Sequence, residues 1–234
     1  MNMKSCSRKK RKEKERPTLM EIYNTLSDFY GPTGWWPGDT PFEIAIGAIL
    51  TQNTAWTNVE KAIENLKKED LLNPYKIIRC DRNQLEQAIR PSGYFRQKAE
   101  RLIIFCKYLI EKYDGKIEKM SHKNISELRN ELLNIKGIGP ETADDILLYA
   151  CGHRIFVVDA YTKRIFSRHG ILEEKLNYNE IQNYFHTYLP QDVYVYKEYH
   201  GLIVWTGKDY CRKIPKCSQC PLNKYPIFNC EKGV

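Results

Sequence analysis

The chain has 234 residues, of which 42% are hydrophobic, 28% charged and 12% aromatic. This composition is ordinary for a globular protein, so a wholly disordered chain and a fibrous repeat are excluded. The sequence contains no run of about 18 apolar residues, and its basic beginning does not resemble a secretory leader. We therefore expect a soluble cytoplasmic protein without a membrane partner, folded as one large or two small domains.

The positive charge is concentrated at the start of the chain. Residues 1–17 hold eight lysines and arginines against two glutamates, which accounts for +6 of the formal net charge of +8. We expect this segment to be a disordered basic arm. Such an arm suits a polyanion, which it would bind by releasing counterions, although a tail that only aids solubility has the same composition.

Helical periodicity and capping residues predict an all-α fold. Thr18 and Glu21 form a capping box ahead of a first helix, which Gly31-Pro32 ends. Apolar residues at helical spacing predict further helices over 42–52, 55–69, 81–90, 96–113, 126–135, 140–151, 160–169, 178–189 and 193–205. No convincing period-two strand with hairpin turn chemistry is present.

Two glycines form a tight turn between two of these helices, in the stretch Lys136-Gly137-Ile138-Gly139-Pro140. Glycine permits close backbone approach and positive φ, and the free N–H groups at the start of the second helix suit an anion. We therefore expect a contact to a DNA phosphate, although a plain helix–helix turn is the alternative. The residues expected to make that contact are Lys136, Gly137, Ile138, Gly139, Glu141 and Thr142.

A carboxylate, Asp159, follows Gly139 by 20 residues and ends the apolar run Phe156-Val157-Val158. This arrangement resembles the helix-hairpin-helix DNA glycosylases of the endonuclease III superfamily. The resemblance implies that Asp159 is catalytic and assists hydrolysis of the N-glycosidic bond by stabilising the sugar cation or orienting water. Taken alone, Asp159 could also be an ordinary N-cap bonded to the Thr162 N–H.

One position departs from the bifunctional members of that superfamily. They carry a lysine two residues beyond the second hairpin glycine, where its amine forms a Schiff base with the sugar, but this chain has Glu141 there. The resemblance therefore implies a monofunctional glycosylase, which leaves an abasic site. Lys136 and Lys163 lie nearby in the sequence and remain alternative nucleophiles.

Several short stretches are similar to the 3-methyladenine glycosylase branch of the superfamily: Trp35-Trp36-Pro37, Leu50 to Trp56, Arg90 to Gly93, and Glu-Thr-Ala-Asp after the hairpin. The resemblance implies a substrate pocket in which Trp36 and Trp56 sandwich a flipped base, Pro37 shapes the wall and Gln52 probes or fills the gap in the duplex. Such stacking favours cationic alkylated purines. Singly, each tryptophan could be a core residue and Gln52 a cap.

Four of the eight cysteines are close together at the end of the chain, as Cys211-x5-Cys217-x2-Cys220-x9-Cys230. In an intracellular protein this clustering favours a metal site over disulfides. The superfamily commonly ends in a four-cysteine loop that holds a four-iron four-sulfur cluster with spacing x6, x2, x5, so the resemblance implies such a cluster as the cofactor. The longer last gap makes Cys230 the least certain ligand, and zinc or free thiols are the alternatives.

The resemblance also implies a domain organisation and a partner. We expect a terminal helical lobe of residues 18–41 plus 153–210, a central helical lobe of 42–152 with the hairpin, and the cluster loop at 211–230. The basic residues of that loop, Arg212, Lys213, Lys216 and Lys224, would contact double-stranded DNA lying across the cleft between the lobes. The protein would be a monomer, associated with the nucleoid.

Three hypotheses follow from the sequence. The first is a base excision repair enzyme that releases alkylated purines. The second keeps the glycosylase chemistry, with or without strand cleavage, but changes the base to a mismatched thymine or an oxidised or deaminated base. The third is a module that binds damaged DNA without cutting it; it has no need of Asp159, because a carboxylate facing the phosphates repels DNA.

Overall fold

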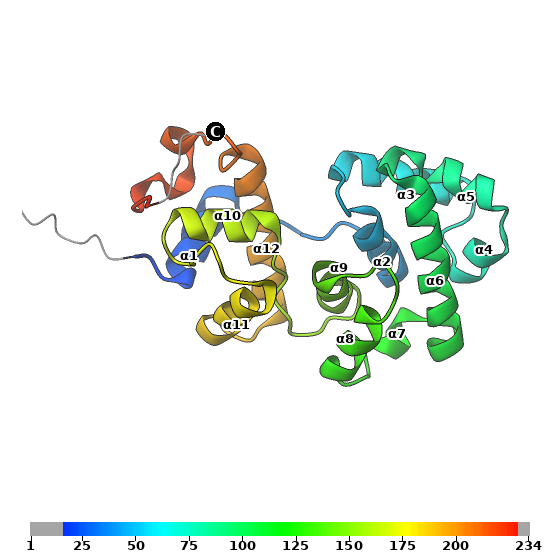
Figure 1. The fold of residues 1–234 in the computed structure, drawn as a ribbon. Coiled ribbons are helices and arrows are strands. Elements are labelled where there is room, and N and C mark those ends of the chain that lie inside the picture. Colours follow the sequence, from blue (N-terminus) through cyan, green and yellow to red (C-terminus); the bar gives the residue numbers. More distant parts are fainter. Residues whose placement is uncertain (1–15, 229–234) are drawn as a thin grey trace, which may run out of the picture.

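The computed structural model describes residues 16–228, and these residues form helices joined by turns and loops, without a β-strand (Figure 1). The predicted all-α fold is therefore confirmed. The predictions for most of the basic arm and for Cys230 lie outside the described residues. None of the helices within 16–228 is long and apolar enough to cross a membrane.

The helices follow one another in the order α1 (Leu19–Tyr30), α2 (Pro41–Leu50), α3 (Trp56–Lys68), α4 (Pro74–Arg79), α5 (Arg82–Ala88), α6 (Phe95–Tyr113), α7 (Ile117–Met120), α8 (Ile125–Leu133), α9 (Pro140–Asp145), α10 (Ala160–Arg168), α11 (Tyr178–Tyr188) and α12 (Val193–Asp209). Short 3-10 turns cover 90–92, 217–219 and 221–224, and a π-helical turn, η2 (Ile146–Ala150), continues α9.

The helix starts follow from local chemistry. The Thr18 hydroxyl accepts a hydrogen bond from the Glu21 N–H while the Glu21 carboxylate accepts one from the Thr18 N–H, so the predicted capping box is present. Thr40 caps α2 and Pro41 is its first residue, which suits a position whose N–H has no partner in the helix. From Ala45 to Leu50 every residue of α2 is buried, so this helix lies in the core.

The structure differs from the predicted helices at several places. The short helices α4 and α7 were not predicted, because four to six residues carry too little apolar periodicity to read. The predicted helix 140–151 changes from α-helical to π-helical hydrogen bonding at Ile146. Helix α12 continues to Asp209, four residues beyond the predicted end at Trp205, and this extension contains Gly207, which packs so closely on Tyr161 that a Cβ there would clash with the Tyr161 ring.

The helices form two groups in space (Figure 1). Helices α2 to α9 lie together on one side, and α1, α10, α11 and α12 lie together with the C-terminal segment on the other. Within the second group α12 packs against α1 and α10, while in the first α2 packs against α3, α6, α9 and η2. Helix α12 also contacts η2, which joins the two groups.

A buried ion pair fastens the hairpin region to both groups. Arg129 of α8 donates two hydrogen bonds to the fully buried Asp144 of α9, at 2.7 and 3.0 Å. Asp144 also accepts hydrogen bonds from Tyr178 at 2.8 Å and from Gln182 at 2.7 Å, both on α11. Both oxygens of this carboxylate therefore accept hydrogen bonds, which a buried charge requires.

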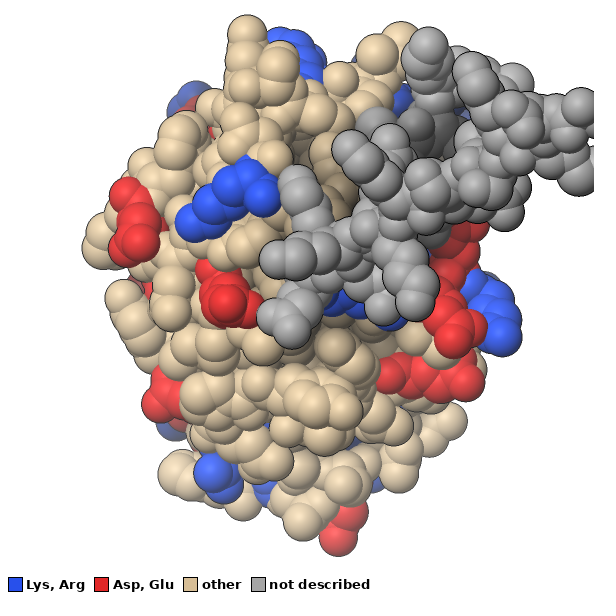
Figure 2. All heavy atoms as spheres, turned by 90° about the vertical axis from the view of Figure 1, so that its left-hand side faces the viewer, with Lys and Arg blue, Asp and Glu red and all other residues tan. Residues whose placement is uncertain are grey.

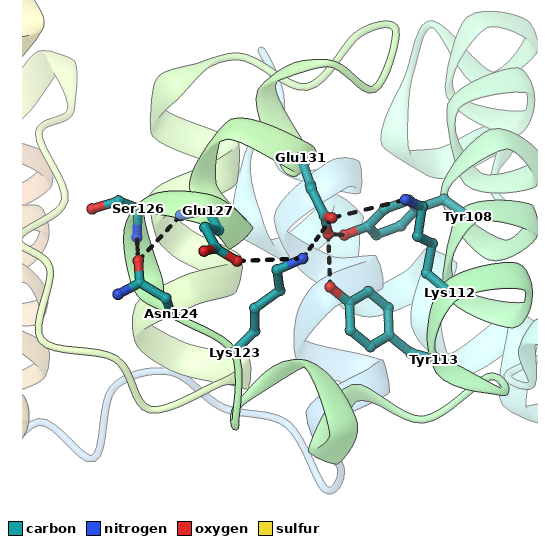
Figure 3. A network of polar contacts seen from close by, with 8 residues as sticks. All are labelled: Tyr108, Lys112, Tyr113, Lys123, Asn124, Ser126, Glu127 and Glu131. Carbon is teal, nitrogen blue, oxygen red and sulfur yellow. Dashed lines mark hydrogen bonds and ion pairs between the residues drawn. The ribbon is translucent and has the colours of Figure 1, made fainter.

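A second polar cluster ties α8 to α6 (Figure 3). The Glu131 carboxylate accepts hydrogen bonds from the hydroxyls of Tyr108 and Tyr113, at 2.8 and 2.7 Å, and pairs with Lys123 at 2.7 Å. Partial burial raises the pKa of Glu131, but these three donors outweigh it and hold the pKa at about 2.

Candidate active site

A hollow with a volume of about 760 Å³ lies where the two helix groups meet. Its walls come from the loop before α2, the loop between α2 and α3 with Trp56, helix α9, the first half of α10, and the second half of α12 with the residues just after it. The lining residues that matter below are Trp35, Trp36, Trp56, Glu141, Asp145, Asp159, Arg164, His200, Lys208 and Lys213. Aromatic, acidic and basic side chains thus face one space.

The aromatic wall contains both predicted stacking residues. The ring centroids of Trp36 and Trp56 lie 5.0 Å apart with an angle of 86° between their planes. Trp36 also lies 5.1 Å from the ring of Tyr149. Gly47 of α2 lies against both indoles, since a Cβ built there would be in van der Waals contact at 3.4 Å from Trp36 Nε1 and 3.7 Å from Trp56. With the planes perpendicular, a base that stacks on one indole meets the edge of the other.

The other two predicted pocket residues lie to the side of this cavity. Pro37 lines an adjoining hollow beside Gly38, Gly47 and Trp56. The Gln52 amide donates to the Gly137 carbonyl at 3.0 Å and to the Thr142 hydroxyl at 2.9 Å, and accepts from Arg101. The Gln52 side chain therefore braces the loop after α2 against the hairpin.

The two hairpin glycines differ in backbone conformation and in their surroundings. Gly137 has a φ of +89°, and a Cβ there would lie 2.5 Å from Arg101 Nε, so both backbone and space require glycine. At Gly139 nothing lies within 4 Å of a built Cβ, so the space above the start of α9 is open. Ile138 is buried, and the exposed Lys136 pairs with Glu100 at 2.9 Å. The open backbone at Gly139 is accessible to a phosphate.

Asp159 caps α10 and faces the cavity at the same time. Its Oδ1 accepts hydrogen bonds from the N–H and the hydroxyl of Thr162, at 2.6 and 2.7 Å. Its Oδ2 lies 3.6 Å from His200 Nε2. Burial raises the pKa of Asp159, but His200 and Thr162 outweigh burial and the net pKa is lowered, so the carboxylate is charged at neutral pH. The capping role and a role in the cavity are thus compatible.

Two residues of this site, His200 and Tyr149, were not predicted from the sequence. His200 is 4% exposed on α12, and its Nδ1 lies 2.6 Å from the Tyr149 hydroxyl. Tyr149, His200 and Asp159 therefore form a chain that reaches from the aromatic wall to the carboxylate. A lone histidine on an apolar helix carries no signal in the sequence that would reveal such a partner.

Two further carboxyl groups line the cavity beside Asp159. Desolvation, and then the negative charge of Asp159, raise the pKa of Glu141 to about 7. Asp145, one helical turn further along, is 6% exposed, and its Oδ1 has no hydrogen-bond partner among the described residues. Desolvation, followed by the charges of Glu141 and Asp159, raises the pKa of Asp145 well above its ordinary value. The one feature of the sequence that could have revealed Asp145 is its spacing of four residues from Glu141.

The comparisons with known proteins agree with this geometry. Residues 46–191 match the profile of the HhH-GPD superfamily of base excision DNA repair proteins. The chain belongs to this family. It is therefore a DNA glycosylase of base excision repair, and the predicted superfamily is confirmed.

Individual relatives match this chain over most of its length and most of their own. A protein of Methanocaldococcus jannaschii whose name assigns it to the DNA repair glycosylases is 50% identical, over 92% of this chain and 98% of its own length. The Helicobacter pylori 3-methyladenine DNA glycosylase, solved bound to 1,N6-ethenoadenine, is 32% identical with a TM-score of 0.73, over 82% of this chain and 98% of its own. An endonuclease III–DNA complex shares the fold, with a TM-score of 0.76 at 24% identity.

The cationic side of the glycosylase cavity lies toward the C-terminal segment. Arg164 of α10 donates to the Cys211 carbonyl at 2.6 Å and lies over the Tyr161 ring at 5.0 Å. Lys208, Arg212 and Lys213 line the same cavity, and Lys208 Nζ lies 5.9 Å from the Trp35 ring. On the outer face of this helix group, basic and acidic side chains are interspersed among uncharged ones (Figure 2).

Three of the four predicted metal ligands lie around one small hollow, which Cys211, Cys217 and Cys220 line together with Arg168 and Pro215. Arg168 donates to Cys211 Sγ at 3.2 Å. Burial, with added repulsion from Cys211 and Cys217, raises the pKa of Cys220 to about 11. Within residues 16–228 no three potential ligand side chains lie close enough together to hold a metal ion, and Cys230 lies outside that range.

Proposed function

We propose that this glycosylase hydrolyses the N-glycosidic bond of alkylated purines such as 3-methyladenine in double-stranded DNA and leaves an abasic site. The observation that carries the proposal is the position of the charged Asp159 in one cavity with Trp36 and Trp56. The 32% identity with a 3-methyladenine DNA glycosylase supports the same substrate class.

The cavity suits an extruded alkylated base. Indole faces attract a cationic purine, because the ring quadrupole presents negative charge to it. Flipping costs a few kcal/mol, which is lowest for a damaged base, so stacking on Trp36 or Trp56 can offset it. In this proposal Pro37 shapes the outer wall, and Gln52 supports the hairpin from the duplex side.

Asp159 would act on the sugar rather than on the base. An alkylated purine already carries a positive charge, so its bond to C1′ breaks without added acid. The deoxyribose then becomes cationic, and a carboxylate held by Thr162 and His200 stabilises that charge while water attacks C1′.

We propose a monofunctional reaction, because Glu141 occupies the position where a Schiff-base lysine would stand. The two alternative amines are engaged elsewhere: Lys136 pairs with Glu100, and Lys163 donates to the Leu176 carbonyl. Lys208 and Lys213 do line the cavity, so they are the amines to test. Borohydride should trap no covalent protein–DNA adduct, and an adduct lost on Lys208→Ala or Lys213→Ala would establish lyase chemistry.

DNA would lie across the mouth of the cavity, between a central lobe of residues 42–152 and a terminal lobe of 18–41 plus 153–210. The N–H groups around Gly139, Glu141 and Thr142 would hold one phosphate, with Lys136, Gly137 and Ile138 supporting the turn. Arg212 and Lys213 would meet the backbone on the opposite side. This arrangement needs a single copy of the chain, so we propose a monomer.

We also propose that the cluster loop, residues 211–230, binds a four-iron four-sulfur cluster. The shared hollow of Cys211, Cys217 and Cys220 fits this assignment, and Cys230 would be the fourth ligand. When bound, the cluster would supply structural support for the basic segment near the cavity. Brown protein with absorbance near 400 nm is the expected result; colourless protein with stoichiometric zinc would instead indicate a zinc site.

The test of the substrate is product analysis on a panel of duplexes. Each duplex carries one of an alkylated purine, a mismatched thymine, an oxidised pyrimidine or 8-oxoguanine, and the released base is identified by mass. We expect alkylated purines to be released fastest. A thymine-DNA glycosylase of Aeropyrum pernix is 27% identical over 94% of this chain, so preferential thymine release is the specific result that would replace this proposal.

A further inference from the structure

Asp145 contributes a second kind of carboxyl group to the cavity, one that the mechanism above does not use. Asp145 lines the cavity at the end of α9 and is 6% exposed. Its Oδ1 is buried and has no hydrogen-bond partner among the described residues. A buried polar atom left unpaired costs about 1–3 kcal/mol. Because Oδ1 is enclosed, a ligand in the cavity would meet the other carboxyl oxygen of Asp145, Oδ2.

The surroundings of Asp145 favour a retained proton. Glu141 precedes it by one turn on α9, Asp144 is its neighbour, and Asp159 faces it from the start of α10. Tyr149 lies close to Asp145, and the other titratable or charged residues that line this space are Tyr161, Arg164, His200, Lys208, Arg212 and Lys213. The pKa of Asp145 is raised and the pKa of Asp159 is lowered, so the two carboxyl groups of this cavity are suited to different roles.

We propose, on the basis of the function proposed above, that Asp145 donates its carboxyl proton to a ring nitrogen of a flipped purine and thereby extends the substrates to uncharged purines such as hypoxanthine. A neutral purine departs poorly as an anion, so it needs a proton that an alkylated purine does not. Stacking against the indoles would hold the neutral base, but only a hydrogen-bond donor at its edge would activate it.

The proposed step balances as follows for hypoxanthine. The Asp145 O–H bond breaks and its proton forms a bond to N7, which leaves Asp145 as a carboxylate. The N9–C1′ bond breaks, and its electron pair stays on the base, which departs neutral. A water oxygen bonds to C1′, and the proton that this water loses returns to Asp145 through solvent.

The experiment measures single-turnover release of hypoxanthine from a deoxyinosine duplex and of methylated purines from the same duplex treated with a methylating agent. Asp145→Asn preserves size and a donor but has no transferable proton. General acid catalysis contributes about 10²- to 10⁴-fold, so we expect this variant to lower the hypoxanthine-to-methylpurine release ratio at least about 100-fold. Asp28→Asn on α1 is the matched control, because Asp28 is exposed on a different helix.

Melting curves first establish that both variants are folded, and an Asp145→Glu variant tests whether a carboxylic acid restores the ratio. Hypoxanthine release that falls equally with methylpurine release in Asp145→Asn would overturn the assignment. Methylpurine release without hypoxanthine release by the unaltered protein would overturn it while leaving the proposed function intact. If the unaltered protein releases neither hypoxanthine nor methylated purines, the proposed function itself is rejected.

Discussion

His200 Nε2 lies 3.6 Å from Asp159 Oδ2, and its other ring nitrogen lies 2.6 Å from the Tyr149 hydroxyl. The hydroxyl fixes the orientation of the imidazole, which in turn faces the carboxylate. His200 is therefore a positioning residue for Asp159, and a proton on Nε2 would point at the oxygen that faces the cavity.

Replacing His200 with Ala should lower the single-turnover rate of base release by about 10- to 100-fold, because the Asp159 carboxylate loses the imidazole that lies 3.6 Å from its Oδ2 and favours its charge. Affinity for damaged duplex should change little, because His200 is only 4% exposed. His200→Asn, which keeps a donor, should recover part of the rate. Equal loss in both variants, accompanied by weaker binding, would indicate a structural role only.

Replacing Trp36 with Ala should act on binding of the flipped base. Stacking on an aromatic side chain contributes about 1–3 kcal/mol per base, so the preference for alkylated over undamaged duplex should fall by about 5- to 150-fold. The measurement is competition binding of the two duplexes. Trp205→Ala is the control, since Trp205 packs against Tyr30 and is outside the cavity lining. An unchanged preference would remove Trp36 from the pocket.

The Glu131 cluster predicts how stability depends on pH. The folded-state pKa of about 2 lies below the ordinary value of 4.5, so Glu131 stabilises the fold above pH 4.5, and this contribution is lost between pH 4.5 and about 2. Glu131→Gln should therefore be less stable than the unaltered protein at pH 7, by on the order of 2 kcal/mol, with a smaller difference at pH 3. Denaturant unfolding at both pH values measures it. A difference that is the same at both would contradict the assignment.

The Arg129–Asp144 pair predicts a larger loss of stability. Arg129→Ala leaves a buried carboxylate without its cation, which typically costs about 3–5 kcal/mol. At about 2–4 °C per kcal/mol, the midpoint of thermal unfolding should fall by about 6–20 °C. The exposed Arg79→Ala is a suitable control. A fall of less than about 2 °C would show that Tyr178 and Gln182 alone sustain Asp144.

Sequence reasoning predicted the longer helices because each has a continuous apolar stripe, as in α3 and α6. The hairpin was predicted from Gly137 and Gly139 between two helices, and the φ of +89° at Gly137 is one that favours glycine. What the sequence could not supply was contact between distant segments. The pairing of Tyr149 with His200, the burial of Asp145 and the bonds from Gln52 to the hairpin all depend on packing across the two helix groups.

The placement of the aromatic rings was also beyond the sequence. Trp36 and Trp56 were expected on two sides of a base, and their planes lie at 86° to each other. Both indoles also pack against Gly47, which lies on a third element, α2. Local patterns identify which residues are aromatic, but not how their rings meet.

The most direct test of the account concerns the Asp159 carboxylate. Asp159→Asn keeps the cap on α10, since the amide oxygen can accept from the Thr162 N–H, but it removes the negative charge from the cavity. We predict that this variant binds alkylated duplex at least as tightly as the unaltered protein and releases the base at least about 100-fold more slowly. Release at the unaltered rate would contradict the account.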